Sequence, residues 1–158
     1  MKRAHPALFV AAVLLSGCTR QMPEVPRRPS AERSTAFRQF SLEAAVARTG
    51  VAELRPTLST GGSGSEPRRA VAIEYAIEGN GAFDEAGFIG RLHAEVERSL
   101  EAAGARVGGG ERLNDQFSVD YTDGGREGWI EVVGARMPGN RYKLWGVLRE
   151  SAPSASRG

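Results

Sequence analysis

The segment RAVAIEYAIE, residues 69–78, alternates strictly along the chain. Val71, Ile73, Tyr75 and Ile77 fall on one face of an extended chain, whereas alanines and glutamates fall on the other. Successive side chains of a β-strand point to opposite faces of its sheet, so this period of two predicts a strand with one buried face. The fold should therefore contain a sheet that is covered on at least one side.

An amphipathic helix is predicted directly after this strand. The sequence GNG at 79–81 supplies a turn, and Asp84 is a suitable N-cap because its carboxylate can accept hydrogen bonds from the first backbone N–H groups. Apolar side chains then recur at four-residue steps, at Phe88, Leu92, Val96 and Leu100. Gly104 is typical of the position that follows a helix. We expect a helix over about 84–103 that packs on the sheet.

Three more segments alternate in the same way as the first strand, namely residues 116–121, 129–135 and 142–148, with turn residues between them. The resulting order β-α-β-β-β predicts an α+β fold over residues 70–150. In this fold, a two-layer sandwich, one helix packs on a mostly antiparallel four-stranded sheet. Residues 151–158 are predicted to be a disordered tail.

The chain before residue 70 is expected to lie outside this compact domain. Residues 19–35 carry three prolines spaced three apart and several arginines, which predicts an extended, solvated tether. Apolar spacing over 36–49 predicts a short helix. The Gly/Ser-rich sequence STGGSGSEPRR at 59–69 predicts a flexible linker.

The first residues have the pattern of a secretory signal. Lys2 and Arg3 precede a nine-residue apolar run, ALFVAAVLL at 7–15. A transmembrane helix needs about 20 apolar residues, so this run is too short for a comfortable span. A positive start followed by a short apolar run and small residues instead predicts a signal peptide.

The end of this segment, Leu15-Ser16-Gly17-Cys18, resembles the lipobox of bacterial lipoproteins. The resemblance implies that the chain is cut before Cys18, so that 1–17 is the signal peptide, and that the thiol of Cys18 carries a diacylglycerol, with further acylation of the freed amine. It also implies a lipid-anchored protein of the bacterial cell envelope. Thr19, where an aspartate would retain many such proteins in the inner membrane, favours the outer membrane.

Composition excludes several classes of function. The formal charge of +2 is too small to predict a nucleic-acid partner. One cysteine allows no disulfide or Cys-based zinc site, and after cleavage His93 is the single remaining histidine. We therefore predict no metal, no cofactor and no catalytic residues, and interpret the protein as a non-enzymatic binding or structural lipoprotein. Its expected partners are the membrane, through Cys18, and an envelope protein or cell-wall component.

A second hypothesis is a small envelope hydrolase that uses a pair of carboxylates. Asp120, Asp123 and Glu131 are the candidates for such a pair. Two carboxylates would have to face each other across a cleft, which the sequence alone neither requires nor forbids.

The partner surface predicted from the sequence is the second face of the sheet. If Tyr142 and Leu144 point toward the helix, the alternation sends another set away from it, which Trp129 joins from the adjacent strand. This set is Lys143, Trp145, Val147 and Arg149. Tryptophan and arginine are enriched in binding hot spots. The alternative is that the helix over 36–49, with Phe37 and Phe40, folds back over these side chains.

Overall fold

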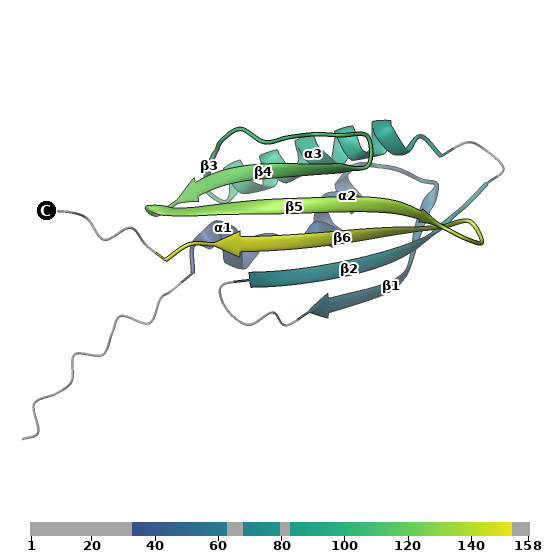
Figure 1. Cartoon of the computed structure of the whole chain (residues 1–158), viewed down its shortest axis with the longest axis horizontal. Helices are drawn as coiled ribbons and strands as arrows, with labels where there is room; N and C mark the ends of the chain where they lie inside the picture. The colour runs from purple at the N-terminus through teal and green to yellow at the C-terminus, as the bar shows by residue number, and fades with distance from the viewer. Residues whose placement is uncertain (1–32, 63–67, 80–82, 153–158) are drawn as a thin grey trace, which may run out of the picture. The chain divides into compact units, whose positions relative to one another are not determined.

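One antiparallel sheet of six strands forms the framework of the protein (Figure 1). The computed structural model describes residues 33–62, 68–79 and 83–152, which belong to a single unit spanning Ala31–Gly158. The signal peptide, Cys18 and the tether up to residue 32 lie outside the described residues, as do 153–158 of the predicted tail. Neighbouring strands follow the order β1-β2-β6-β5-β4-β3. The strands are β1 (Leu54–Gly62), β2 (Arg68–Ile77), β3 (Arg106–Val107), β4 (Gln116–Asp123), β5 (Arg126–Met137) and β6 (Arg141–Glu150).

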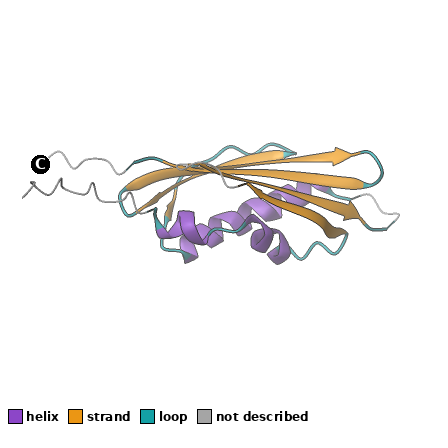
Figure 2. Cartoon of the chain, turned by 90° about the horizontal axis from the view of Figure 1, so that it is seen from below, coloured by secondary structure: helices purple, strands orange, loops and turns teal. Residues whose placement is uncertain are grey.

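The described residues form three helices. Figure 2 shows the helices on one face of the sheet. They are α1 (Thr35–Gln39), α2 (Leu42–Arg48) and α3 (Glu85–Ala102). No helix within residues 33–62, 68–79 and 83–152 is both long and apolar enough to cross a membrane.

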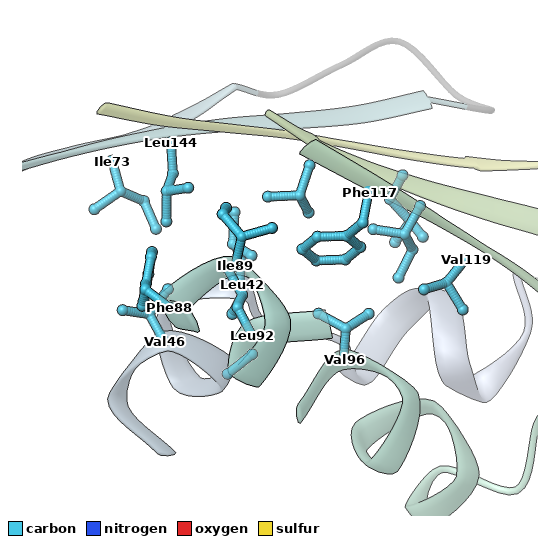
Figure 3. Packing of buried hydrophobic residues seen from close by; sticks show 14 of the residues in the cluster. Leu42, Val46, Ile73, Phe88, Ile89, Leu92, Val96, Phe117, Val119 and Leu144 are labelled. Atoms are coloured by element: carbon cyan, nitrogen blue, oxygen red, sulfur yellow. The ribbon is translucent and has the colours of Figure 1, made fainter. Parts of the chain in front are cut away.

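The hydrophobic core lies between the helices and the sheet. Figure 3 shows Phe88 and Val96 of α3 in this layer with Ile73, Leu144 and Phe117 of the strands, all of them buried. Burial of one such side chain contributes about 1.5–3 kcal/mol. The alternating apolar residues of the strands therefore form the sheet side of the core, and the apolar residues at four-residue steps in α3 form its helix side.

The predicted fold class is confirmed in its coarse form: the protein is α+β with an antiparallel sheet. The helix predicted over 84–103 is α3. The Asp84 carboxylate accepts a hydrogen bond from the N–H of Gly87 at 2.9 Å, and Gly104 has the positive φ of +90° expected beyond a helix end. The four predicted strands are β2, β4, β5 and β6.

The predicted number of four strands is wrong, because the described part of the linker predicted over 59–69 is strand; residues 63–67 lie outside the described residues. Residues 59–62 belong to β1 and pair with β2, with Ser59 opposite Ile73 and Gly62 opposite Ala70. Glycine and serine favour flexibility in an isolated chain, but a neighbouring strand that satisfies the backbone hydrogen bonds overrides this preference. The sixth strand is the two-residue β3, which is too short to show an alternating pattern.

The predicted start of the compact domain at residue 70 is also too late. Phe37, Leu42 and Val46 are buried in the same core as α3 and the sheet. The predicted helix over 36–49 is two helices, because Phe40 is extended (ψ 132°) and the Ser41 hydroxyl accepts a hydrogen bond from the N–H of Ala44, which starts α2.

Ser151, the first residue of the predicted disordered tail, is bonded to β5. The backbone N–H of Ser151 donates to the carbonyl of Glu127 at 2.8 Å, and the Ser151 hydroxyl donates to the same carbonyl at 2.9 Å. Both bonds extend the pairing of β6 with β5 by one residue.

Candidate functional site

The side of the sheet that faces away from the helices is called the open face here. Burial alternates along β5 and β6, so that every second side chain points away from the core. The strand registers place the matching positions of β2 and β4 on the same side. The predicted partner residues Trp129, Lys143, Trp145, Val147 and Arg149 all lie on this face.

Trp145 lies near the middle of the open face. It is 37% exposed, and its neighbours on the adjoining strands are Ala72 and Val133. Because these apolar neighbours are smaller than tryptophan, the indole protrudes from the surface that they form. The Lys143 ammonium lies 5.2 Å from the Trp145 ring centroid, within the range of a cation–π contact.

Lys143 also joins an ion pair on this face. Its Nζ lies 2.9 Å from Oε1 of Glu74, and Arg141 Nη1 lies 4.0 Å from Oε2 of the same carboxylate. The hydrogen bond and charge of Lys143 lower the pKa of Glu74 below its ordinary value, and Arg141 adds to the shift. These three charges therefore satisfy one another.

A second aromatic group lies nearer the C-terminal end of β6. Arg149 is directly opposite Trp129, with its guanidinium carbon 5.0 Å from the ring centroid. Asp120 is opposite Trp129 on the other side, and Arg68 is opposite Arg149. Arg68, Arg149, Trp129 and Asp120 therefore form one row across β2, β6, β5 and β4. Three of them, Trp129, Arg149 and Asp120, also line a pocket of about 670 Å³.

The helices do not cover the two tryptophans. Phe37 of α1 is buried in the core between helices and sheet, and Phe40 packs against the same core. Figure 2 shows α1 and α2 on the side of the sheet that α3 occupies. The alternative in which residues 36–49 fold over Trp129 and Trp145 is therefore wrong.

The three candidate carboxylates of a hydrolase do not share one face. Asp123 accepts a hydrogen bond from the backbone N–H of Ala36 at 2.8 Å, at the beginning of α1. Asp120 and Glu131 lie on the open face, where Glu131 is opposite Val147 and Ser118. Across the part of the chain that the structure describes, no group of three or more His, Cys, Asp or Glu residues could hold a metal ion.

His93 lies at the margin of the core on α3. Its ring packs edge-on against Phe117 with centroids 5.0 Å apart, and its Nε2 lies 3.6 Å from a carboxylate oxygen of Glu97 on the next turn. The imidazole therefore packs within the fold, and its buried Nε2 has no hydrogen-bond partner among the described residues.

A small pocket that the sequence did not predict lies where α1 meets α2. It measures about 230 Å³ and is lined by Phe40, Leu148 and the polar side chains of Ser41, Glu43 and Arg69. Burial lowers the pKa of the Arg69 guanidinium, which donates to the carbonyl of Phe40 at 2.5 Å. The alternation over 69–78 places Arg69 on the same face as Val71, but its contact with the Phe40 carbonyl depends on where residues 36–49 pack.

A buried polar cluster near the start of the described chain was also not predicted. Glu150 is buried, with 2% of its surface exposed, and its carboxylate accepts a hydrogen bond from the backbone N–H of Ser34 at 3.2 Å. Nη1 of Arg126 lies 3.9 Å from Glu150 Oε2, and Nη1 of Arg33 lies 4.0 Å from it. The contacts of Glu150 with Ser34 and Arg33 join residues 116 and 117 positions apart, which no local pattern could reveal.

Comparison with known proteins gives no relative: neither a protein-family model nor a curated protein matches this chain.

Proposed function

We propose that this chain is a lipid-anchored protein of the bacterial cell envelope that acts by binding rather than by catalysis. The observation that carries the proposal is the sequence Leu15-Ser16-Gly17-Cys18 after a positive start and a nine-residue apolar run. Acylation of Cys18 would give this protein its location, and Thr19 favours the outer membrane.

The anchoring follows from the physics of acyl chains. Each buried CH₂ contributes about 0.8 kcal/mol, and a single acyl chain gives only marginal membrane binding. A diacylglycerol on the Cys18 thiol together with an acyl chain on its amine would hold the chain stably on a bilayer.

The open face supports the binding part of the proposal. Monomeric proteins seldom expose contiguous apolar patches larger than a few hundred Å², and larger patches mark interaction sites. Here Trp145 is flanked by Ala72 and Val133, and Trp129 by Arg149. Tryptophan and arginine are the side chains that most often dominate binding energy at interfaces.

Labelling with radioactive palmitate tests the anchor. We expect the wild-type chain to incorporate label and to sediment with membranes, and Cys18→Ser to do neither. Ser16→Ala is the matched control, because a small residue remains in the lipobox and labelling should persist. Label that remained in Cys18→Ser would contradict the assignment of Cys18.

Affinity capture from the envelope tests the binding surface. We expect a specific component to be recovered with the wild-type chain and lost with Trp145→Ala. Arg91→Ala, an exposed change on α3, should retain it. Equal recovery with both variants would contradict binding through the open face.

A further inference from the structure

We propose that the occupant of the open face is a second copy of this chain, which forms a two-fold symmetric dimer by sheet-on-sheet packing. This inference rests on the proposed role of the open face as a binding surface. It adds the identity of the partner, and it follows from how charge and apolar surface are distributed on the face.

Two like charges lie on neighbouring strands of the open face. Arg68 of β2 lies directly opposite Arg149 of β6. Like charges in opposite positions of a sheet are destabilising. Within the described ranges neither guanidinium is in an ion pair, in contrast to Lys143 and Arg141, which share Glu74. No described carboxylate therefore neutralises either arginine.

A group of carboxylates lies on the other half of the same face. Asp120 of β4 lies opposite Trp129, and Glu127 and Glu131 flank that tryptophan along β5. None of these three carboxylates is in an ion pair with a residue of the described chain. The open face is thus divided into a basic half on β2 and β6 and an acidic half on β4 and β5.

Two-fold symmetry brings these halves together. Two sheets that pack face to face lie about 10 Å apart with their strands roughly aligned. Consider a two-fold axis that is parallel to the strands and lies between β6 and β5. It places the row from Arg68 to Asp120 in one copy over the same row in the other copy, in the opposite order. Arg68 of one copy then lies over Asp120 of the other, and Arg149 lies over Trp129. The two-fold axis repeats the Arg68–Asp120 pair, so that opposite charges meet on both sides of the interface. Glu131 of one copy lies over Val147 of the other, next to Arg149 on the same strand.

The apolar centre of the face fits the same arrangement. The axis between β6 and β5 places Trp145 of one copy over Val133 of the other, because these two residues are opposite each other in the sheet. Val147 and Ala72 lie beside them and add apolar surface. An apolar centre with an aromatic anchor and a charged rim is the usual anatomy of a protein interface.

The size of the face is close to what a stable interface needs. Four strands spaced about 4.8 Å apart, over about ten residues of about 3.4 Å each, give a flat footprint of roughly 650 Å². Protruding side chains increase the accessible area beyond this footprint. A stable interface buries about 800 Å² on each partner.

The mass of the purified full chain in detergent, measured by light scattering and sedimentation over a range of concentrations, tests this proposal. We expect the wild type to form a dimer, and Arg68→Glu and Asp120→Arg each to weaken it about tenfold or more. The double variant Arg68→Glu/Asp120→Arg restores the opposite charges and should recover most of the affinity. Arg91→Glu, on α3, is the matched control and should dimerise as the wild type does.

Trp145→Ala provides an independent test of the apolar centre, with about tenfold or greater weakening expected. Circular dichroism and the melting temperature of each variant show whether the monomer remains folded. Charge variants at exposed strand positions keep the test valid even where Trp145→Ala unfolds.

A wild-type chain with the monomer mass at every concentration would overturn the dimer, as would a double variant that associates no better than either single variant. If that chain still captured an envelope component through Trp145, the proposed function would stand with a different partner. If it also lost capture and palmitate label, the proposed function would fail separately.

Discussion

The phenol ring of Tyr142 lies over Gly134 on the neighbouring strand, so that a Cβ atom at position 134 would overlap the Tyr142 hydroxyl and approach its ring carbon Cζ to 2.7 Å. Gly134 is therefore required by the close approach of an aromatic ring rather than by a turn. Tyr142 in turn packs edge-on against Phe83 and Phe88, with ring centroids 5.1 and 5.8 Å away. These contacts limit the directions in which the ring can move.

Gly134→Ala should consequently destabilise the fold by about 1–3 kcal/mol, the usual cost of overpacking a core. Gly61→Ala is the matched control, because a Cβ at that position meets nothing within 4 Å and the residue also lies in a strand. Urea unfolding followed by circular dichroism measures both. Equal stability of the two variants would show that Tyr142 can shift at no cost.

The buried Glu150 carboxylate connects the last strand to Arg33 and Ser34 at the start of the described chain. It also contacts Arg126 at the start of β5. Removal of one partner of a buried ion pair leaves the remaining charges uncompensated and costs about 3–5 kcal/mol. We expect a loss of this order for Glu150→Ala. Glu127→Ala, an exposed change on the adjoining strand, should cost under 1 kcal/mol or so.

Chemical denaturation at pH 7 distinguishes these two glutamates. A change of less than about 1 kcal/mol in Glu150→Ala would mean that the cluster adds little to stability. Limited proteolysis adds a local measurement: cleavage near residue 34 should accelerate in Glu150→Ala, because the backbone N–H of Ser34 loses its acceptor.

Glu43 should make stability depend on pH. Partial burial raises its pKa, but hydrogen bonds from its own backbone, from Ser59 at 2.8 Å and from Ser41 at 3.1 Å outweigh this and lower the pKa below its ordinary value of 4.5. A group with a lowered pKa in the folded state stabilises the fold above its unfolded pKa, and the contribution is lost as the pH falls through the folded value.

Wild type should therefore be more stable than Glu43→Gln near neutral pH, and the difference should disappear as the pH falls below 4.5. Thermal unfolding at a series of pH values measures this difference. Glu101→Gln, exposed on α3, should show no comparable trend. A difference that grew toward acid pH would reverse the sign of the argument.

The parts of the fold that could be predicted are those in which local pattern and final burial agree. In β2 and α3 the apolar side chains recur at the period of the element, and the same side chains fill the core. In β1 the composition of residues 59–62 predicts flexibility, while the partner strand that orders them becomes apparent only in the sheet. The break between α1 and α2 depends on Phe40 and Ser41, whose roles emerge from packing.

The features of the open face also divide into those that local pattern could predict and those that depend on tertiary contacts. Alternation alone placed Trp145 and Arg149 on the second face. It could not show that Arg68, assigned to a linker, lies opposite Arg149, since that contact depends on the pairing of β2 with β6. Nor could it show whether the helices cover the tryptophans, because the face on which α1 and α2 pack is decided by tertiary contacts.

Thr19 gives the last prediction, which concerns location. If Cys18 is acylated as proposed, the residue after it should influence which membrane retains the protein, and Thr19→Asp should move the chain from the outer to the inner membrane fraction in a Gram-negative host. Thr19→Ser, which keeps a small hydroxyl side chain, is the matched control and should leave the distribution unchanged. Separation of the membranes on a sucrose gradient, with palmitate label as the marker, measures the shift. Because neither change alters Cys18, both variants should remain labelled to the wild-type extent. A labelled Thr19→Asp chain that stayed in the outer membrane would contradict the sorting role of this position and leave the acylation of Cys18 intact.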